Sequence, residues 1–124
     1  MAGRRRVDPV DGHEALQACR SSPDLSRVAR PVLATAVRYT LEELTARHPG
    51  RSVEVRVPPH GAVQCIEGPM HKRGTPPNVV ETDAPTWLGL VTGTVAWAEA
   101  EASGGIRASG LRADLSAYLP MAGV

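Results

Sequence analysis

The residues able to take part in acid–base, nucleophilic or metal chemistry are few and scattered. The four histidines are His13, His48, His60 and His71, each next to a glycine, a proline or a charged residue. No two are four apart and no HExxH pattern occurs, so the sequence predicts no metal site. Because it also has neither a GxSxG elbow nor a glycine-rich phosphate loop, we expect no catalytic residue and no cofactor.

The two cysteines, Cys19 and Cys65, stand apart without CxxC spacing. The basic start MAGRRR has no apolar stretch behind it, which indicates a cytoplasmic protein, where isolated thiols stay reduced. Cys65 falls within an expected strand, which favours a small buried side chain over a nucleophile. We therefore expect both thiols to be free.

One basic cluster lies in the expected folded part, at His71, Lys72 and Arg73. A solvated loop is the ordinary interpretation of such a cluster. The alternative is an anion clamp centred on Arg73, because a guanidinium presents a planar fork that matches carboxylate or phosphate. The sequence leaves both open.

The stretch GTPPNVVETDAPTW, residues 74–87, is mainly explained by backbone structure. Its double proline favours extended chain, and NVVET then suits a short strand. Thr82 or Asp83 can cap a following helix whose first turn contains Pro85. Asp83 as a catalytic carboxylate has no visible partner.

Composition indicates one ordinary folded domain. The chain has 124 residues, 42% hydrophobic and 22% charged, and its 14 basic side chains are nearly balanced by 13 acidic ones. That balance argues against nucleic-acid binding, since such proteins usually carry a basic excess. No apolar run of 18 residues occurs, so we expect no transmembrane segment. Oligomeric state stays open.

The positions of apolar residues predict the elements that must hold any site. Residues 1–22 are expected to be a flexible tail with a short helix at 13–20, and 23–124 the folded domain. In PVLATAVRYTLEELTARHPG, apolar residues recur at the helical period on one side, while Arg38 can pair with Glu42 and Glu43 with Arg47 on the other. Pro49-Gly50 ends this helix.

Alternation then replaces the helical period. SVEVRV turns Val53, Val55 and Val57 to one side, and AVQCIEG reads as the returning strand after a PPHG turn. A strand at 78–82, helices at 84–92 and 95–102, a strand at 106–109 and a last helix over LRADLSAYLP follow. Because strands and helices are grouped, the fold class is α+β.

The second half of the chain resembles the sterol carrier protein-2 family. The family pattern has an acidic residue after an extended segment, then a short helix ending in Leu-x-x-Gly, and then a second short helix bearing an alanine. A glycine, a short strand and a closing glycine follow. In this sequence the pattern is filled by Asp83, Leu90, Gly93, Ala100, Gly104, Ile106 and Gly110. More narrowly, RHPGRSVEVRVPP…AVQC…RGTPPNVVETD…TWL resembles small stand-alone bacterial orthologues of the actinobacterial type. Related modules form the C-terminal part of mycothiol-dependent maleylpyruvate isomerase-like enzymes.

The resemblance implies an SCP2-like fold with a four- or five-stranded, mostly antiparallel sheet covered by helices on one face. It also implies an apolar tunnel that holds fatty acyl chains, acyl-CoA or sterols without transforming them. Two departures bear on the tunnel: Glu101 and Ala102 replace the usual bulky residues, and the proline-rich connection leaves little room for an extra strand. The expected lining is Val55, Val57, Val63, Trp87, Leu90, Val91, Ile106, Leu115 and Leu119.

Three functions remain open from the sequence. The first is a non-catalytic carrier of a fatty acyl or other apolar small molecule. The second is an accessory module of a mycothiol-dependent isomerase-type system, and the third an interaction module with a filled core. The sequence does not separate a tunnel from a dense core of valine and leucine.

Overall fold

The helix with the clearest apolar stripe is also the longest in the computed structural model, which describes residues 6–69 and 78–124. It is α2 (Arg30–Arg47), and its Val37, Leu41 and Leu44 are at most 1% exposed. Pro31 lies in the first turn, where its missing N–H is not needed. Arg47 Nε donates to Glu43 across one turn at 2.9 Å, as the spacing predicted.

The N-terminal region is more ordered than the sequence predicted. Helix α1 (Pro9–Ser21) starts at Pro9 rather than at 13, because the Asp8 carboxylate accepts a hydrogen bond from the Val10 N–H and caps it. Leu16 of this helix is fully buried. Gly12 lies close against Tyr39 of α2, so α1 is packed against the longest helix. A 3₁₀ turn, Leu25–Arg27, joins the two helices.

The sheet has the order β2-β1-β3-β4, formed by β1 (Val53–Val57), β2 (Gly61–Cys65), β3 (Asn78–Thr82) and β4 (Ile106–Ser109). Strand β1 pairs antiparallel with β2 and parallel with β3, while β3 pairs antiparallel with β4. The three valines of β1 are fully buried, which confirms the predicted register. A mostly antiparallel sheet of four strands matches the expected α+β class.

Capping side chains set the bounds of the next helix. In α3 (Ala84–Thr92), Asp83 Oδ1 accepts from the Thr86 N–H at 2.8 Å, and Gly93 ends the helix in the left-handed conformation. Thr82 instead donates to the Gly105 carbonyl, which joins β3 to the segment before β4. Helix α4 (Trp97–Ala102) follows, slightly shorter than predicted.

The last predicted helix does not form. Residues 110–124 make turns instead, and Leu111, expected on the buried face, is completely exposed. The Asp114 carboxylate accepts from the Ser116 N–H, a local bond that competes with helical pairing. Arg112 N–H donates to Asn78 Oδ1 and Met121 N–H to the Val91 carbonyl, so the segment is held by bonds to distant elements.

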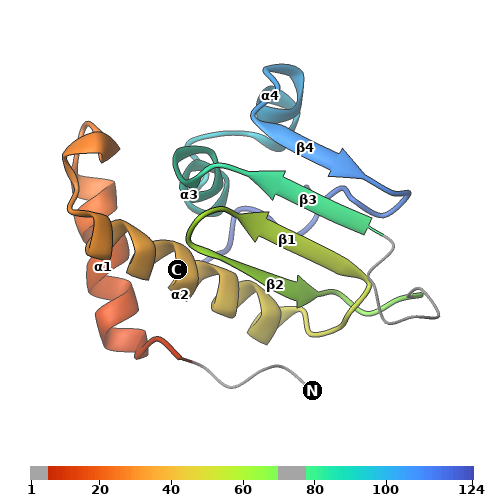
Figure 1. Cartoon of the computed structure of the whole chain (residues 1–124), viewed down its shortest axis with the longest axis horizontal. Helices are drawn as coiled ribbons and strands as arrows, with labels where there is room; N and C mark the ends of the chain where they lie inside the picture. Colours follow the sequence, from red (N-terminus) through yellow and green to blue (C-terminus); the bar gives the residue numbers. More distant parts are fainter. Residues whose placement is uncertain (1–5, 70–77) are drawn as a thin grey trace.

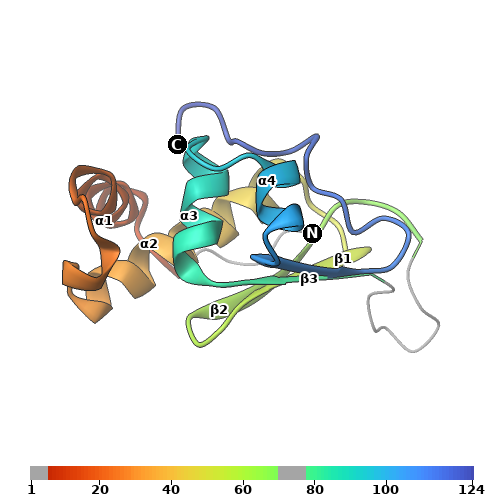
Figure 2. The same cartoon turned by 90° about the horizontal axis from the view of Figure 1, so that it is seen from above.

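The elements form two layers. Figures 1 and 2 show α2, α3, α4 and the C-terminal segment on one face of the sheet, with α1 beside α2 away from the strands. The other face carries half-exposed or exposed charged side chains, among them Glu54 and Arg56, which pair at 2.9 Å. This agrees with the expected one-sided cover.

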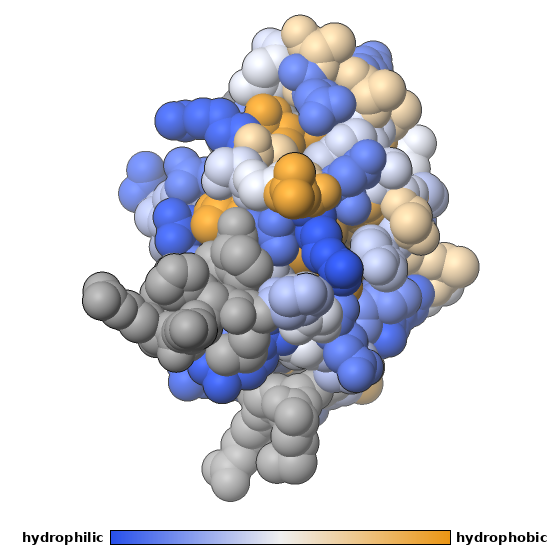
Figure 3. Space-filling model, turned by 90° about the vertical axis from the view of Figure 1, so that its right-hand side faces the viewer, coloured by the Kyte–Doolittle hydropathy of each residue, from blue (hydrophilic) through white to orange (hydrophobic). Residues whose placement is uncertain are grey.

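One buried polar contact joins α3 to α2 within the covered layer. The Trp87 indole N–H donates to Thr40 Oγ1 at 2.8 Å, and both residues are inaccessible to solvent. On the face shown in Figure 3, hydrophobic surface occurs in small areas between hydrophilic side chains. No helix among the described residues is long and apolar enough to cross a membrane.

Candidate functional site

The structure brings the expected apolar lining together in one hydrophobic core. Seven of these side chains are at most 6% exposed, and Val63 and Leu119 are partly buried and pack against the others. The seven come from β1, α3, β4 and the C-terminal segment: Val55, Val57, Trp87, Leu90, Val91, Ile106 and Leu115. Whether they contact a ligand stays a prediction.

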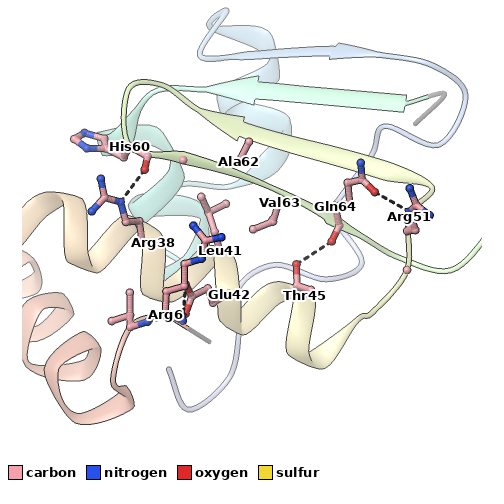
Figure 4. Close-up of a pocket in the computed structure, with 13 residues that line it drawn as sticks. Arg6, Arg38, Leu41, Glu42, Thr45, Arg51, His60, Ala62, Val63 and Gln64 are labelled. Carbon is pink, nitrogen blue, oxygen red and sulfur yellow. Dashed lines mark hydrogen bonds between the residues drawn. The ribbon is translucent and has the colours of Figure 1, made fainter. Parts of the chain in front are cut away.

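The larger of two described hollows lies at the edge of the sheet, between α2 and β2 (Figure 4). We call it the edge groove. It is open to solvent and has a volume of about 1140 Å³. Its walls are formed by α2, by β2 with the turn before it, by the connection from α2 to β1, and by the N-terminal segment: Arg38, Leu41, Glu42, Thr45; His60, Gly61, Ala62, Val63, Gln64; Gly50, Arg51; Arg6, Val7.

Two side chains of α2 fix the helix against the edge strand. Arg38 Nε donates to the His60 carbonyl and Thr45 Oγ1 donates to the Gln64 carbonyl, both at 2.9 Å. Two small residues of β2, Gly61 and Ala62, form part of the groove wall. A Cβ added at Gly61 would reach Leu41 at 3.6 Å, an ordinary contact, so a methyl group would fit there without a clash.

The carboxylate of Glu42 holds the backbone of the N-terminal segment beside the groove. Glu42 accepts from the backbone N–H groups of Arg6 and Val7 at 3.1–3.2 Å. The predicted pairing of Glu42 with Arg38 is therefore wrong, because each has a more distant partner. The segment forms one wall of the edge groove.

The lining of the edge groove is mixed in character and mainly basic. Val63 and Val7 supply apolar surface, and the charged lining residues are the three arginines Arg6, Arg38 and Arg51 and the single carboxylate of Glu42. No described carboxylate forms an ion pair with those three guanidinium groups. Partial burial, with Arg38 and Arg30 nearby, lowers the pKa of His60 below its usual value. Such a lining suits a ligand with both apolar and anionic parts.

The described residues contain no group of three or more His, Cys, Asp or Glu able to hold a metal ion. Burial raises the pKa of Cys65 to about 12, so its thiol stays protonated and is a poor nucleophile. Thr45 and Glu42 are already engaged in the hydrogen bonds given above.

We expect the cysteines to react only after unfolding. Cys19 and Cys65 are free and buried, and burial raises the pKa of both thiols. In the native protein at pH 8, Cys65 should be labelled by iodoacetamide at least about tenfold more slowly than in denaturant. Mass spectrometry without reductant should find both labelled once the chain is unfolded. Rapid native labelling of Cys65 would contradict its described burial.

Sequence reasoning missed the edge groove. Arg73, the proposed anion clamp, lies outside the described residues, whereas Arg38 and Arg51 line the groove and were not proposed as ligand residues. Val63 is the one expected lining residue that reaches it. The sequence offers no direct signal, since the partner of Arg38 is 22 positions away along the chain.

Comparison with known proteins supports the resemblance found in the sequence. Residues 29–121 match the family of bacterial SCP orthologs, which covers both α2 and all four strands. The chain belongs to this family. No curated protein matches it. In this SCP ortholog the matched region begins at α2, so α1 lies before it.

Proposed function

We propose that this SCP ortholog binds a fatty acyl ligand without transforming it, with the ligand in the edge groove. The observation that carries the proposal is the juxtaposition of apolar and basic side chains along one open hollow. Membership of an SCP-like family supports an apolar ligand. The predicted lining from α3 and β4 is packed in the core, whereas the edge groove provides space without rearrangement.

The chemistry of the groove suits an amphipathic chain. Val7 and Val63 can cover methylene groups, each of which contributes up to about 0.8 kcal/mol when fully buried. Guanidinium groups nearby can hold a carboxylate through charge-assisted hydrogen bonds. An open groove covers a chain only partly, so the gain per methylene should be below that limit.

The proposal is tested by titrating delipidated protein with fatty acids of eight to eighteen carbons. We expect saturable binding with midpoints in the micromolar range, about −8 kcal/mol, measured by calorimetry. Methyl NMR signals of Leu41 and Val63 should shift, and those of Leu90 and Val91 in the core should not. Val63→Asp should weaken binding at least about tenfold, because it places a like charge beside the carboxylate.

Val79→Asp is the matched control, since Val79 is also half-exposed on a strand but lies outside the edge groove. It should leave the affinity unchanged. Failure of every chain length to bind would reject the proposed function.

The core is the competing location for the ligand. Trp97 is 8% exposed, and its indole N–H is buried without a hydrogen-bond partner among the described residues. A ligand oxygen reaching the core would satisfy that donor, which otherwise loses free energy on burial. A saturable change in tryptophan emission, with no shift at Leu41 or Val63, would move the site from the edge groove to the core.

A second candidate function is an interaction module with a filled core. The full burial of Val55, Trp87, Val91 and Leu115 favours it, since such packing leaves their surfaces no room for a chain. An accessory module of a thiol-dependent enzyme system is one form of this function. The interaction-module function becomes the better supported one if delipidated protein binds no acyl ligand and co-purifies instead with a partner protein.

A further inference from the structure

The two edges of the sheet differ in how they are covered. At the β2 edge, Thr45 of α2 donates to the Gln64 carbonyl. Arg38 of the same helix donates to the His60 carbonyl, so α2 is bonded along this edge. At the β4 edge, within the described part of the chain, residues 106–109 form no backbone–backbone hydrogen bond outside the ladder with β3. The N–H and C=O groups that β4 turns away from β3 are therefore open to another strand.

The helical layer does not reach the outer edge of β4. Figures 1 and 2 show β4 as the outermost strand, with α4 on the covered face of the sheet. Ala108 lies opposite Val80 in the ladder, so both side chains point to that face. Val80 is 1% exposed, whereas Ala108 is exposed, as are Arg107 and Ser109 beside it. Leu111, just beyond the strand, is completely exposed, so the covering layer stops short of this edge.

The sequence of β4 does not protect this edge. Edge strands that avoid pairing usually carry proline, a bulge or several charges. Strand β4 (Ile106–Ser109) has a single charged side chain, Arg107, and no proline. Its register with β3 is unbroken, so it also has no bulge. The edge of β4 is therefore suited to accept a further strand.

We propose that the occupant is β4 of a second copy of this chain, paired antiparallel about a two-fold axis at Ala108. When two identical antiparallel strands continue one sheet with both helical layers on the same side, the axis places one residue opposite itself. An axis at Arg107 would place two guanidinium groups opposite each other, which is unfavourable. An axis at Ala108 places Arg107 opposite Ser109 of the second copy and keeps all four residues of β4 in the ladder.

Charges on the uncovered face are complementary in this register. Arg56, Glu81 and Arg107 lie side by side across β1, β3 and β4, so their charges alternate. The Arg107 side chain is 85% exposed and its Nη2 lies 3.9 Å from Glu81 Oε2. In the dimer it extends beside the uncharged Ser109 and Val79 of the second copy, where the Ser109 hydroxyl can accept a hydrogen bond. No like charges then meet across the two β4 strands.

The small size of this interface sets the expected affinity. Two strands of four residues bury less surface than the roughly 1,200–2,000 Å² of stable complexes, so the dimer should be weak, with a dissociation constant on the order of 100 µM. The edge groove lies at the β2 edge, on the other side of the sheet. It stays open in both copies, so this inference does not depend on the proposed function.

Sedimentation equilibrium of the unaltered chain, from about 10 µM to about 1 mM, measures the association. We expect the average mass to rise from that of one chain toward that of two. Over the same range, the β4 amide groups that point away from β3 should exchange more slowly with solvent, and those of β2 should not change. The mass of a single chain at the highest concentration would overturn the proposal and leave the edge to a different occupant.

A cysteine at the axis tests the register. Ala108→Cys places two thiols opposite each other with Cβ atoms about 4.5–5.5 Å apart, close to the separation that a disulfide needs. Oxidised glutathione should then give a covalent dimer linked through position 108, because both native cysteines are buried. Ala62→Cys is the matched control, since Ala62 is also an exposed alanine on an edge strand, and it should remain a single chain. Equal cross-linking of the two variants would overturn the assignment to β4.

Charge at position 109 gives a readout whose sign depends on the register. Ser109→Glu should tighten the dimer about fivefold, because a carboxylate then faces Arg107 of the second copy at two symmetric places. Ser109→Arg should weaken it about fivefold, because like charges then oppose each other. Ala62→Glu and Ala62→Arg make the same changes in net charge at the other edge and should leave the dissociation constant unchanged. The same constant for both Ser109 variants would overturn the proposed pairing.

Discussion

Val55→Asp should lower the free energy of unfolding by at least about 4 kcal/mol. Val55 is fully buried at the centre of β1, and its cross-strand neighbours are Val63 on β2 and Val80 on β3. A carboxylate there would be removed from water and surrounded by valines. Since domains of this size are usually stable by about 5–15 kcal/mol, the variant should be largely unfolded on mild warming. Urea denaturation followed by circular dichroism measures the loss.

Glu54→Ala is the matched control for Val55→Asp, which tests whether β1 turns its valines toward the core. Glu54 is adjacent in the strand but points to the uncovered face, where it pairs with Arg56 at an exposed site. Loss of such a pair should change the stability by less than about 0.5 kcal/mol. Equal losses for the two variants would show that β1 does not turn its valines inward.

Gly12→Ala should destabilise the protein by about 1–3 kcal/mol, although alanine is the better helix former. A Cβ at Gly12 would lie 2.7 Å from Tyr39 Cβ and would also overlap the Tyr39 ring, so α1 and α2 would have to separate. Tyr39 is 8% exposed and has little room to move. Thermal unfolding should therefore begin at a lower temperature than in the parent protein.

The sign of this effect reports whether α1 is packed. In an unattached helix the same substitution should be favourable by about 1 kcal/mol. Glu14→Ala, at an exposed position of α1, should change the stability by less than about 0.5 kcal/mol. A higher melting temperature for Gly12→Ala would mean that α1 does not contact α2 in solution.

Elements whose signal is local could be predicted from the sequence. The alternating valines of β1 and the capped start of α3 at Asp83 depend on neighbours within a few residues, and both appear as expected. The predicted C-terminal helix does not form, and the reason is physical. Leu115 and Leu119 do recur at the helical period, but the bonds from Arg112 to Asn78 and from Met121 to Val91 hold the chain in another path.

The edge groove could not be predicted because its walls meet only in the tertiary structure. Arg38 belongs to a helix and His60 to a turn, and their hydrogen bond spans the intervening strand. Likewise, Glu42 was expected to bond one turn away, yet it holds the backbone of Arg6 and Val7. Periodicity shows that such side chains are exposed, but it does not show which other exposed residues they face.

The place of β1 in the sheet has a consequence for the order in which the chain can fold. Its pairing with β2 closes over a short turn, whereas its parallel pairing brings Asn78 to Val53 across the whole intervening segment. Closing the longer loop costs more chain entropy, so it should follow the shorter one. The hairpin and α2 can therefore assemble first. The C-terminal half then completes the domain by adding to a strand that already has one partner.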